Sequence, residues 1–274
     1  MIYVTGANGQ LGSELRQKLG PKAVFLNRDQ LDLSDINAVE SFLKQTKIEL
    51  LINAGAYTLV DKAETEQRVA LIINSETPKL MSKYSREKKF KLIHFSSDYV
   101  FNGNNFLPYV ETDLPDPVNF YGKTKLEGER GVLEENSESL IIRTSWVYSS
   151  FGKNFVKTIL RIAAERDQLN IVFDQVGTLT SAQDLAETTL KARELSGIYH
   201  YSNEGVSSWY DVAIEIRRIM KLKTTIMPIL THEYPTPAKR PHYSVLNKNK
   251  IKQALGISIP HWTESLELCL QKPS

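Results

Sequence analysis

The chain has 274 residues, of which 41% are hydrophobic and 24% are charged, a composition typical of a globular protein with a full apolar core. Its 34 basic and 32 acidic side chains are interspersed and give a net charge of +2, which argues against a nucleic-acid or membrane partner. The sequence has one cysteine, Cys269, no apolar run near about 18 residues and no signal peptide, so we expect a soluble protein of the cytoplasm.

Short apolar segments alternate with helix-period segments through the first half of the chain. Because each parallel crossover needs a connecting helix, this alternation predicts an α/β fold, a doubly wound parallel sheet with helices on both faces. The predicted strands are residues 2–5, 23–27, 50–53, 91–96 and 140–143, and the main predicted helices are residues 10–19, 36–43, 65–88 and 121–135.

The pattern changes after about residue 149. Helical segments are predicted at 151–166, 182–195, 209–220 and 266–270, with short strands at 170–173 and 198–201 and a proline-rich turn at 234–241. We therefore predict a first lobe over residues 1–148 and a smaller C-terminal α/β lobe over 149–274. A segment near 178–200 is expected to pack back on the first lobe.

A glycine-rich loop joins the first predicted strand to the first predicted helix. Glycines let the backbone turn tightly and approach a pyrophosphate, which rests on the positive end of the helix. The spacing is G-x-x-G-x-x-G rather than G-x-G-x-x-G, and a plain glycine-rich turn is the alternative. The position after an N-terminal strand favours a dinucleotide, as in a Rossmann domain, with contacts from Gly6, Asn8, Gly9, Gln10 and Leu11.

The end of the second strand bears on the choice of cofactor. An acidic residue there binds the ribose 2′-hydroxyl of NAD, whereas this chain has Arg28, which matches the 2′-phosphate of NADP. The neighbouring Asp29 weakens this argument, and a solvated arginine is the alternative. We expect Asp32 and Leu33 to border the adenine. NADPH is the favoured cofactor, and use of NADH is left open.

Small residues also follow the third strand, at the carboxyl edge of the sheet where ligands of such folds bind. They would permit close approach of a cofactor, although a tight turn explains them equally well. The residues concerned are Asn53, Ala54, Gly55, Ala56 and Tyr57.

A Tyr-x-x-x-Lys pair places both side chains on one helix face, where the ammonium stabilises the phenolate. The pattern occurs twice, as Tyr84/Lys88 and as Tyr121/Lys125. The first pair precedes the fourth strand and faces away from the carboxyl edge. The second pair follows that strand, whose end supplies Ser97. A serine hydroxyl and a phenol can converge there on one carbonyl oxygen, so we assign Ser97, Tyr121 and Lys125 as catalytic.

These features together resemble the extended short-chain dehydrogenase/reductases, and more specifically the dTDP-4-dehydrorhamnose reductase family. The resemblance runs in order from residue 1 to about 265. The segments that carry it are 5–12, 53–64, 96–101, 120–129, 143–148, 152–155, 174–177 and 234–241.

The resemblance implies that NADPH reduces the C4 ketone of a dTDP-linked 4-keto-6-deoxy sugar, dTDP-4-dehydro-6-deoxy-L-mannose, to dTDP-L-rhamnose. Tyr121 would donate the proton, Ser97 would hydrogen-bond the same oxygen, and Lys125 would tune Tyr121 and hold the nicotinamide ribose. Core packing is the alternative role for Trp146. The residues implied near the substrate are Ser97, Asp98, Val100, Arg143, Trp146, Asn154 and Arg240.

Two departures from the family pattern stand out. The family usually has Ser-Thr-Asp at the strand end, whereas Ser97 replaces the threonine here and keeps the hydroxyl. Some members hold magnesium with carboxylates at a dimer contact. Glu14 matches one of these carboxylates but Gln183 replaces another, so we expect no metal. A homodimer is left open.

Two other functions compete with this interpretation. A non-catalytic regulatory subunit would keep the fold and bind NADP without turnover, although the intact Ser97, Tyr121 and Lys125 argue against it. Another nucleotide-sugar reductase, an epimerase or a dehydratase of the same fold would share these residues. The epimerases and dehydratases hold NAD tightly and recycle it.

Overall fold

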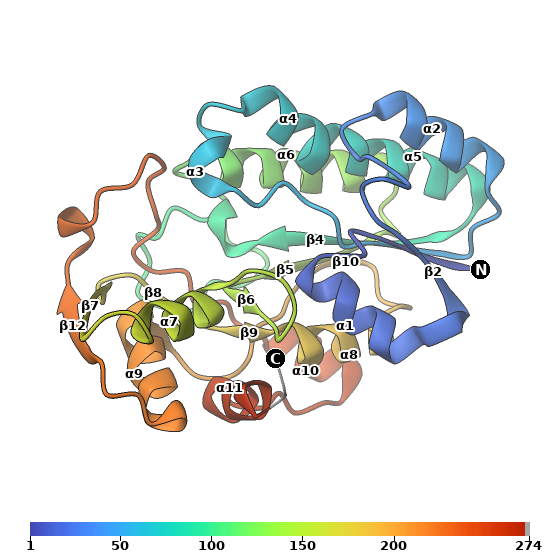
Figure 1. The fold of residues 1–274 in the computed structure, drawn as a ribbon. Coiled ribbons are helices and arrows are strands. Elements are labelled where there is room, and N and C mark those ends of the chain that lie inside the picture. The colour runs from blue at the N-terminus through green and yellow to red at the C-terminus, as the bar shows by residue number, and fades with distance from the viewer. Residues whose placement is uncertain (272–274) are drawn as a thin grey trace.

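The centre of the first lobe is a six-stranded sheet in the order β10-β5-β4-β3-β1-β2. The computed structural model describes residues 1–271. All neighbouring strands of this sheet are parallel, which confirms the predicted doubly wound fold (Figure 1). The strands are β1 (Ile2–Thr5), β2 (Ala23–Leu26), β3 (Leu50–Asn53), β4 (Lys91–Ser97), β5 (Leu140–Thr144) and β10 (Gly197–His200).

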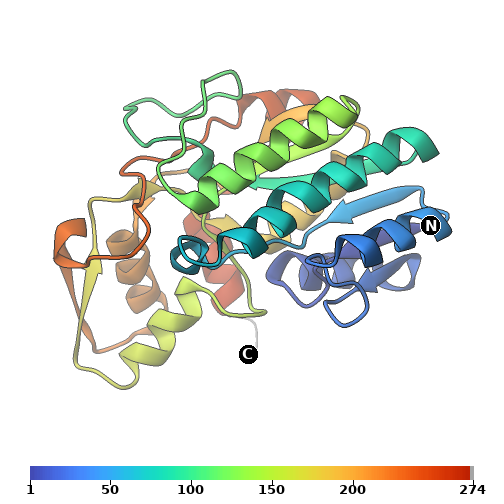
Figure 2. The same cartoon turned by 90° about the horizontal axis from the view of Figure 1, so that it is seen from above.

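Helices cover both faces of the sheet, and the central strands are apolar on both sides. Successive strand residues point to opposite faces, so Ile93 and Phe95 of β4 join one core while Leu92 joins the other. Figure 2 shows α5 and α6 side by side over the strands. One face is covered by α1 (Gln10–Leu19), α8 (Ala182–Lys191) and α10 (Asn249–Leu255), and the other by α2 (Ile36–Gln45), α5 (Thr77–Lys88) and α6 (Phe120–Glu135).

The single helix predicted over residues 65–88 is wrong in its first part. Two short helices, α3 (Val60–Ala63) and α4 (Gln67–Leu71), precede a π-helical turn over Ile72–Glu76, and α5 begins only at Thr77. The wide turn carries the buried Asn74, whose side chain accepts from Tyr57 N at 2.9 Å and donates to Tyr57 O at 3.0 Å. These bonds tie the loop after β3 to the helix layer.

The second lobe has its own core around the parallel pair β7 (Gln168–Val172) and β12 (Thr225–Ile229). Its helices begin at side-chain caps: Asn154 caps α7 (Phe155–Ala163), Ser208 caps α9 (Trp209–Met220) and His261 caps α11 (Trp262–Leu270). Two further short pairs are β6 (Val147–Tyr148) with β9 (Thr180–Ser181), and β8 (Val176–Gly177) with β11 (Ser207–Ser208).

Parts of the second half complete the first lobe. Strand β10 forms an edge of the main sheet, and α8 packs against α1. Of the helices in residues 1–271, none is both long and apolar enough to cross a membrane.

Candidate active site

The carboxyl end of β4 and the first turns of α6 bring Ser97, Tyr121 and Lys125 to one place. Strand β4 ends at Ser97, whose hydroxyl donates to Asp98 Oδ1 at 2.9 Å and accepts from Tyr99 N at 3.1 Å. Lys125 Nζ donates to the Phe95 carbonyl of the same strand at 2.6 Å. This bond fixes α6 against β4, with Tyr121 one turn before the lysine.

Burial changes the proton affinities of this site. It raises the pKa of Tyr121 to about 12, with hydrogen bonding to Ser97 opposing the rise. Burial lowers the pKa of Lys125 to about 8, with the charge of Glu129 opposing the fall. Tyr121 is therefore a protonated phenol at neutral pH, while Lys125 still carries most of its charge. The site thus holds one phenolic proton and, one helical turn away, one positive charge.

Asp98 lies directly after Ser97 and is 2% exposed. Burial raises the pKa of its carboxyl to about 6, although the hydroxyls of Ser244 and Ser97 oppose the rise. A buried carboxyl beside Ser97 can accept a hydrogen bond from a ligand hydroxyl.

The second tyrosine–lysine pair is engaged elsewhere. Tyr84 OH donates to Glu40 Oε1 on α2 at 2.9 Å, and Lys88 Nζ donates to the carbonyls of Leu43 and Lys44. Lys88 ends the helix that precedes the start of β4, whereas Ser97 lies at the end of that strand. Tyr84 and Lys88 are thus packing residues of the helix layer.

The glycine loop meets the loop after β3 so closely that no side chain fits between them. Gly6 has φ of +67°, and a Cβ there would lie 2.5 Å from Gly55 N and 2.7 Å from the Ala54 carbonyl carbon. A Cβ on Gly12 would lie 2.3 Å from Gly6 O. Helix α1 starts after Gly9 without a side-chain cap. The exposed positive end of α1, beside an unobstructed backbone, suits a pyrophosphate.

A cavity of about 550 Å³ adjoins this loop. Arg28 lies at its rim, with Nε 3.1 Å from Asp32 Oδ2 and its side chain 77% exposed. Hydrogen bonds from Ser34 lower the pKa of Asp32, so the carboxylate is charged and holds the guanidinium at the cavity. The cavity is lined by Gly6, Asn27, Arg28, Leu31, Asp32, Leu33, Gly55, Ala56, Tyr57, Thr58, Leu59, Glu66, Val69 and Ile73.

Not all residues expected at the cofactor face this cavity. Asn53 is 1% exposed; it accepts from Thr5 Oγ1 at 2.7 Å and its amide lies 3.1 Å from His94 Nδ1. It therefore joins the ends of β1, β3 and β4 under the loops. Gln10 donates to Val147 O at 3.2 Å, which joins the glycine loop to β6, directly before the second lobe.

Two residues expected at the substrate, Arg143 and Val100, have their side chains buried in the core. Arg143 is 2% exposed and forms two hydrogen bonds with Glu129, from Nε to Oε1 at 2.9 Å and from Nη2 to Oε2 at 2.7 Å. Its guanidinium also lies over the Phe101 ring, with Cζ 5.1 Å from the ring centroid. Val100 is fully buried in a small core with Phe101 and Leu126. The side chains of both residues are thus enclosed by the protein, and the contacts with substrate expected of them stay a prediction.

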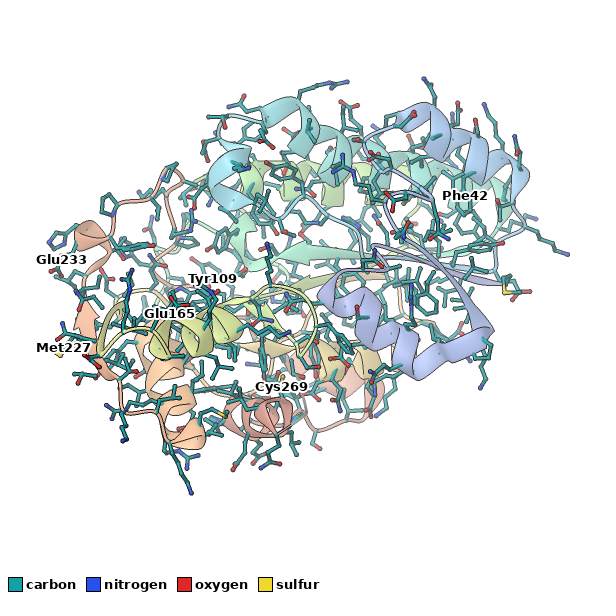
Figure 3. All side chains as sticks on the ribbon, in the orientation of Figure 1. Phe42, Tyr109, Glu165, Met227, Glu233 and Cys269 are labelled. Atoms are coloured by element: carbon teal, nitrogen blue, oxygen red, sulfur yellow. The ribbon has the colours of Figure 1, made fainter. Side chains whose placement is uncertain are left out.

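The other expected substrate residues lie between the lobes. Trp146 has φ of +46° and stacks on Trp209 with ring centroids 3.6 Å apart. Asn154 caps α7 and donates to Gln10 Oε1 at 2.9 Å. Arg240 lines a second cavity, of about 730 Å³, together with Tyr99, whose ring packs edge-on against Tyr121. In Figure 3, Glu233 of this cavity and Phe42 of the first lobe lie at opposite ends of the molecule.

Comparison with known proteins decides the family. Residues 1–274 match the family model described as the RmlD substrate binding domain. A dTDP-4-dehydrorhamnose reductase of Burkholderia thailandensis is 38% identical to the chain over 98% of each protein. The chain belongs to the dTDP-4-dehydrorhamnose reductase family.

Solved structures of this reductase family have the same fold. The protein from Clostridium acetobutylicum is 39% identical, with a TM-score of 0.94 over 98% of each chain. The protein from Bacillus anthracis, solved in complex with NADP, is 35% identical, with the same TM-score and coverage. The family resemblance inferred from the sequence motifs is therefore confirmed.

Sequence reasoning missed two residues that hold the start of α6, the helix of this reductase that carries Tyr121. Asn119 Oδ1 accepts from Gly122 N at 2.8 Å, and Glu64 Oε1 accepts from Phe120 N at 2.9 Å. Asn119 could have been found as an N-cap residue directly before an apolar helical run. Glu64 gave no such signal, because its partner is 56 residues away.

Proposed function

We propose that the protein uses NADPH to reduce the C4 ketone of dTDP-4-dehydro-6-deoxy-L-mannose to dTDP-L-rhamnose. The observation that carries this proposal is the convergence of Ser97, Tyr121 and Lys125 at the carboxyl end of β4. The membership of the reductase family and the NADP complex of its Bacillus anthracis relative support the cofactor and the substrate class.

The residues around the glycine loop fit a dinucleotide phosphate. Gly6 and Gly9 would hold the pyrophosphate at the start of α1, with Asn8, Gln10 and Leu11 beside it. Asp32 and Leu33 would border the adenosine, and Arg28 would meet the 2′-phosphate with the N–H groups that Asp32 leaves free. The cofactor, when bound, supplies a hydride from its nicotinamide ring.

The protein supplies the proton and stabilises the oxygen that receives it. Tyr121 donates its phenolic proton to the carbonyl oxygen as charge develops there. Lys125, held by the Phe95 carbonyl, places an ammonium beside the phenolate that remains. Ser97 turns its hydroxyl from Asp98 to the same oxygen, since one O–H cannot serve both acceptors.

The decisive experiment measures NADPH oxidation by the purified protein against a panel of dTDP- and UDP-linked 4-keto sugars. We expect turnover with the dTDP-4-keto-6-deoxy sugar and a fall in kcat of at least about 10²-fold in Tyr121→Phe, the usual scale for losing a general acid. Tyr84→Phe is the matched control and keeps full activity, because its hydroxyl bonds Glu40 on α2, away from Ser97. Binding of NADP without turnover on any sugar would instead indicate a regulatory subunit.

The proposal also covers the location of the protein in the cell and its oligomeric state. We place the protein in the cytoplasm, since its lone cysteine suits a reducing compartment. A measurement of the protein's mass in solution tests directly whether it forms a homodimer.

A further inference from the structure

Asp61 of α3 reaches across to the second half of the chain and holds the loop that carries Arg240. Its Oδ2 accepts from Arg240 Nη2 at 2.9 Å, and its Oδ1 accepts from Ala238 N at 3.2 Å. Arg240 Nη1 closes the loop on itself by donating to Ala238 O at 2.8 Å. One carboxylate thus fixes both the backbone and the side chain of this loop.

We propose that Asp61 is a positioning residue that holds Arg240 ready for the diphosphate of the nucleotide sugar. The inference rests on the proposed function, which makes a nucleoside diphosphate part of the substrate. It adds a role for a residue of the first lobe that does not itself need to touch the ligand.

The number of free hydrogen-bond donors on Arg240 supports this role. A guanidinium has five N–H groups in one plane, and the bonds to Asp61 and Ala238 occupy two of them. Three donors remain on a group whose orientation is already fixed, and a planar fork of this kind matches phosphate oxygens. Arg240 lines the cavity of about 730 Å³ between Tyr99 and the second lobe, so an anion there can reach it.

The charges around the pair are consistent with a holding role. Burial raises the pKa of the Asp61 carboxyl, but the hydrogen bonds from Arg240 and Ala238 outweigh it, and the pKa lies below its ordinary value. Asp61 is therefore ionised at neutral pH. Its side chain is 41% exposed whereas that of Arg240 is 16% exposed, so the pair sits at the wall of the cavity rather than in the core.

The same loop is attached to the catalytic helix. Asn119 Nδ2 donates to Lys239 O at 2.8 Å while Asn119 Oδ1 caps α6. Tyr121 lies in the first turn of that helix. A diphosphate bound by Arg240 is thus held at a fixed distance from the proton donor, which is the geometric condition for placing the sugar.

The test measures binding of dTDP and of NADPH by calorimetry, together with Tm, in Asp61→Asn. The asparagine keeps an acceptor for Ala238 N–H but presents an uncharged amide to Arg240. We expect the Kd of dTDP and the KM of the sugar nucleotide to rise roughly three- to tenfold, the scale set by immobilising one long side chain. The kcat, the Kd of NADPH and Tm should stay near the wild-type values. Glu215→Gln, which breaks the exposed pair with Arg218 on α9, is the matched control and changes none of them.

The variant Arg240→Ala separates the outcomes. If Asp61 acts through Arg240, Arg240→Ala weakens dTDP binding and adding Asp61→Asn to it changes little further. Normal dTDP binding by Asp61→Asn alongside weak binding by Arg240→Ala overturns the inference and leaves the proposed function intact. If Arg240→Ala binds dTDP normally, Arg240 does not contact the diphosphate. Turnover with the dTDP sugar then tests the proposed function independently. If Asp61→Asn lowers both the affinity for NADPH and Tm, Asp61 only stabilises the fold.

Discussion

Replacing Lys125 by methionine should stabilise the protein while removing its activity. A pKa of about 8 instead of 10.5 means that the buried ammonium is less favourable in the folded state by about 3 kcal/mol. Methionine fills similar space without a charge, but the variant loses the 2.6 Å hydrogen bond to Phe95 O, worth about 1–2 kcal/mol. The net gain is about 1–2 kcal/mol, which corresponds to a rise in Tm of roughly 2–6 °C at pH 7. We expect kcat to fall at least about 10²-fold.

The pH dependence of Tm distinguishes removal of the buried charge from better packing as the cause of the stabilisation. Between pH 8 and 10.5 the unfolded Lys125 binds more protons than the folded one, so wild-type stability from this group rises with pH. The advantage of Lys125→Met should therefore be full below pH 8 and shrink towards pH 10. Differential scanning calorimetry at pH 7 and pH 10 measures it. An equal or lower Tm at pH 7, or an advantage that does not change with pH, would refute the reasoning. Lys123→Met, on the exposed face of the same helix, is the control and leaves both activity and Tm near wild type.

Substitutions at three other positions, Arg28, Ser97 and Gly6, test the remaining parts of the site. Arg28→Ala should lower the preference for NADPH over NADH in kcat/KM by removing a phosphate contact, and an unchanged ratio would exclude that role. Ser97→Thr should keep activity within roughly tenfold. Ser97→Ala should lose about 5- to 150-fold in kcat/KM, because one hydrogen-bond donor to the substrate carbonyl oxygen is gone. A fully active alanine variant would exclude Ser97 from the mechanism. Gly6→Ala should weaken NADPH binding and lower the free energy of unfolding by at least about 2 kcal/mol. Gly20 also has a positive φ but has open space around it, so Gly20→Ala should lower the free energy of unfolding by about 1 kcal/mol. Urea unfolding measures the stability of both variants.

Much of the first lobe could be predicted because its signals are local. Strand and helix alternation predicted the parallel sheet, and the loop that contains Gly6 was correctly placed between the first strand and the first helix. The choice of Tyr121 over Tyr84 needed only the knowledge of which end of β4 each helix meets. The π-helical turn at Ile72–Glu76 was not predictable, because it follows from the tertiary contact between Asn74 and Tyr57 rather than from helix propensity. The same holds for Asp61, whose partners lie 177 and 179 residues away.

Arg143 shows how a residue can matter to the site without facing the substrate. Its two hydrogen bonds fix the carboxylate of Glu129, which lies one turn after Lys125 on α6. Removing an ammonium from water lowers its pKa, and the Glu129 charge is what opposes this at Lys125. A buried Glu129 carboxylate without a partner would be costly, and the ion pair with Arg143 offsets that cost. The Arg143–Glu129 pair thus supports the charge of Lys125 from within the core, and this gives the buried arginine near the end of β5 a structural role.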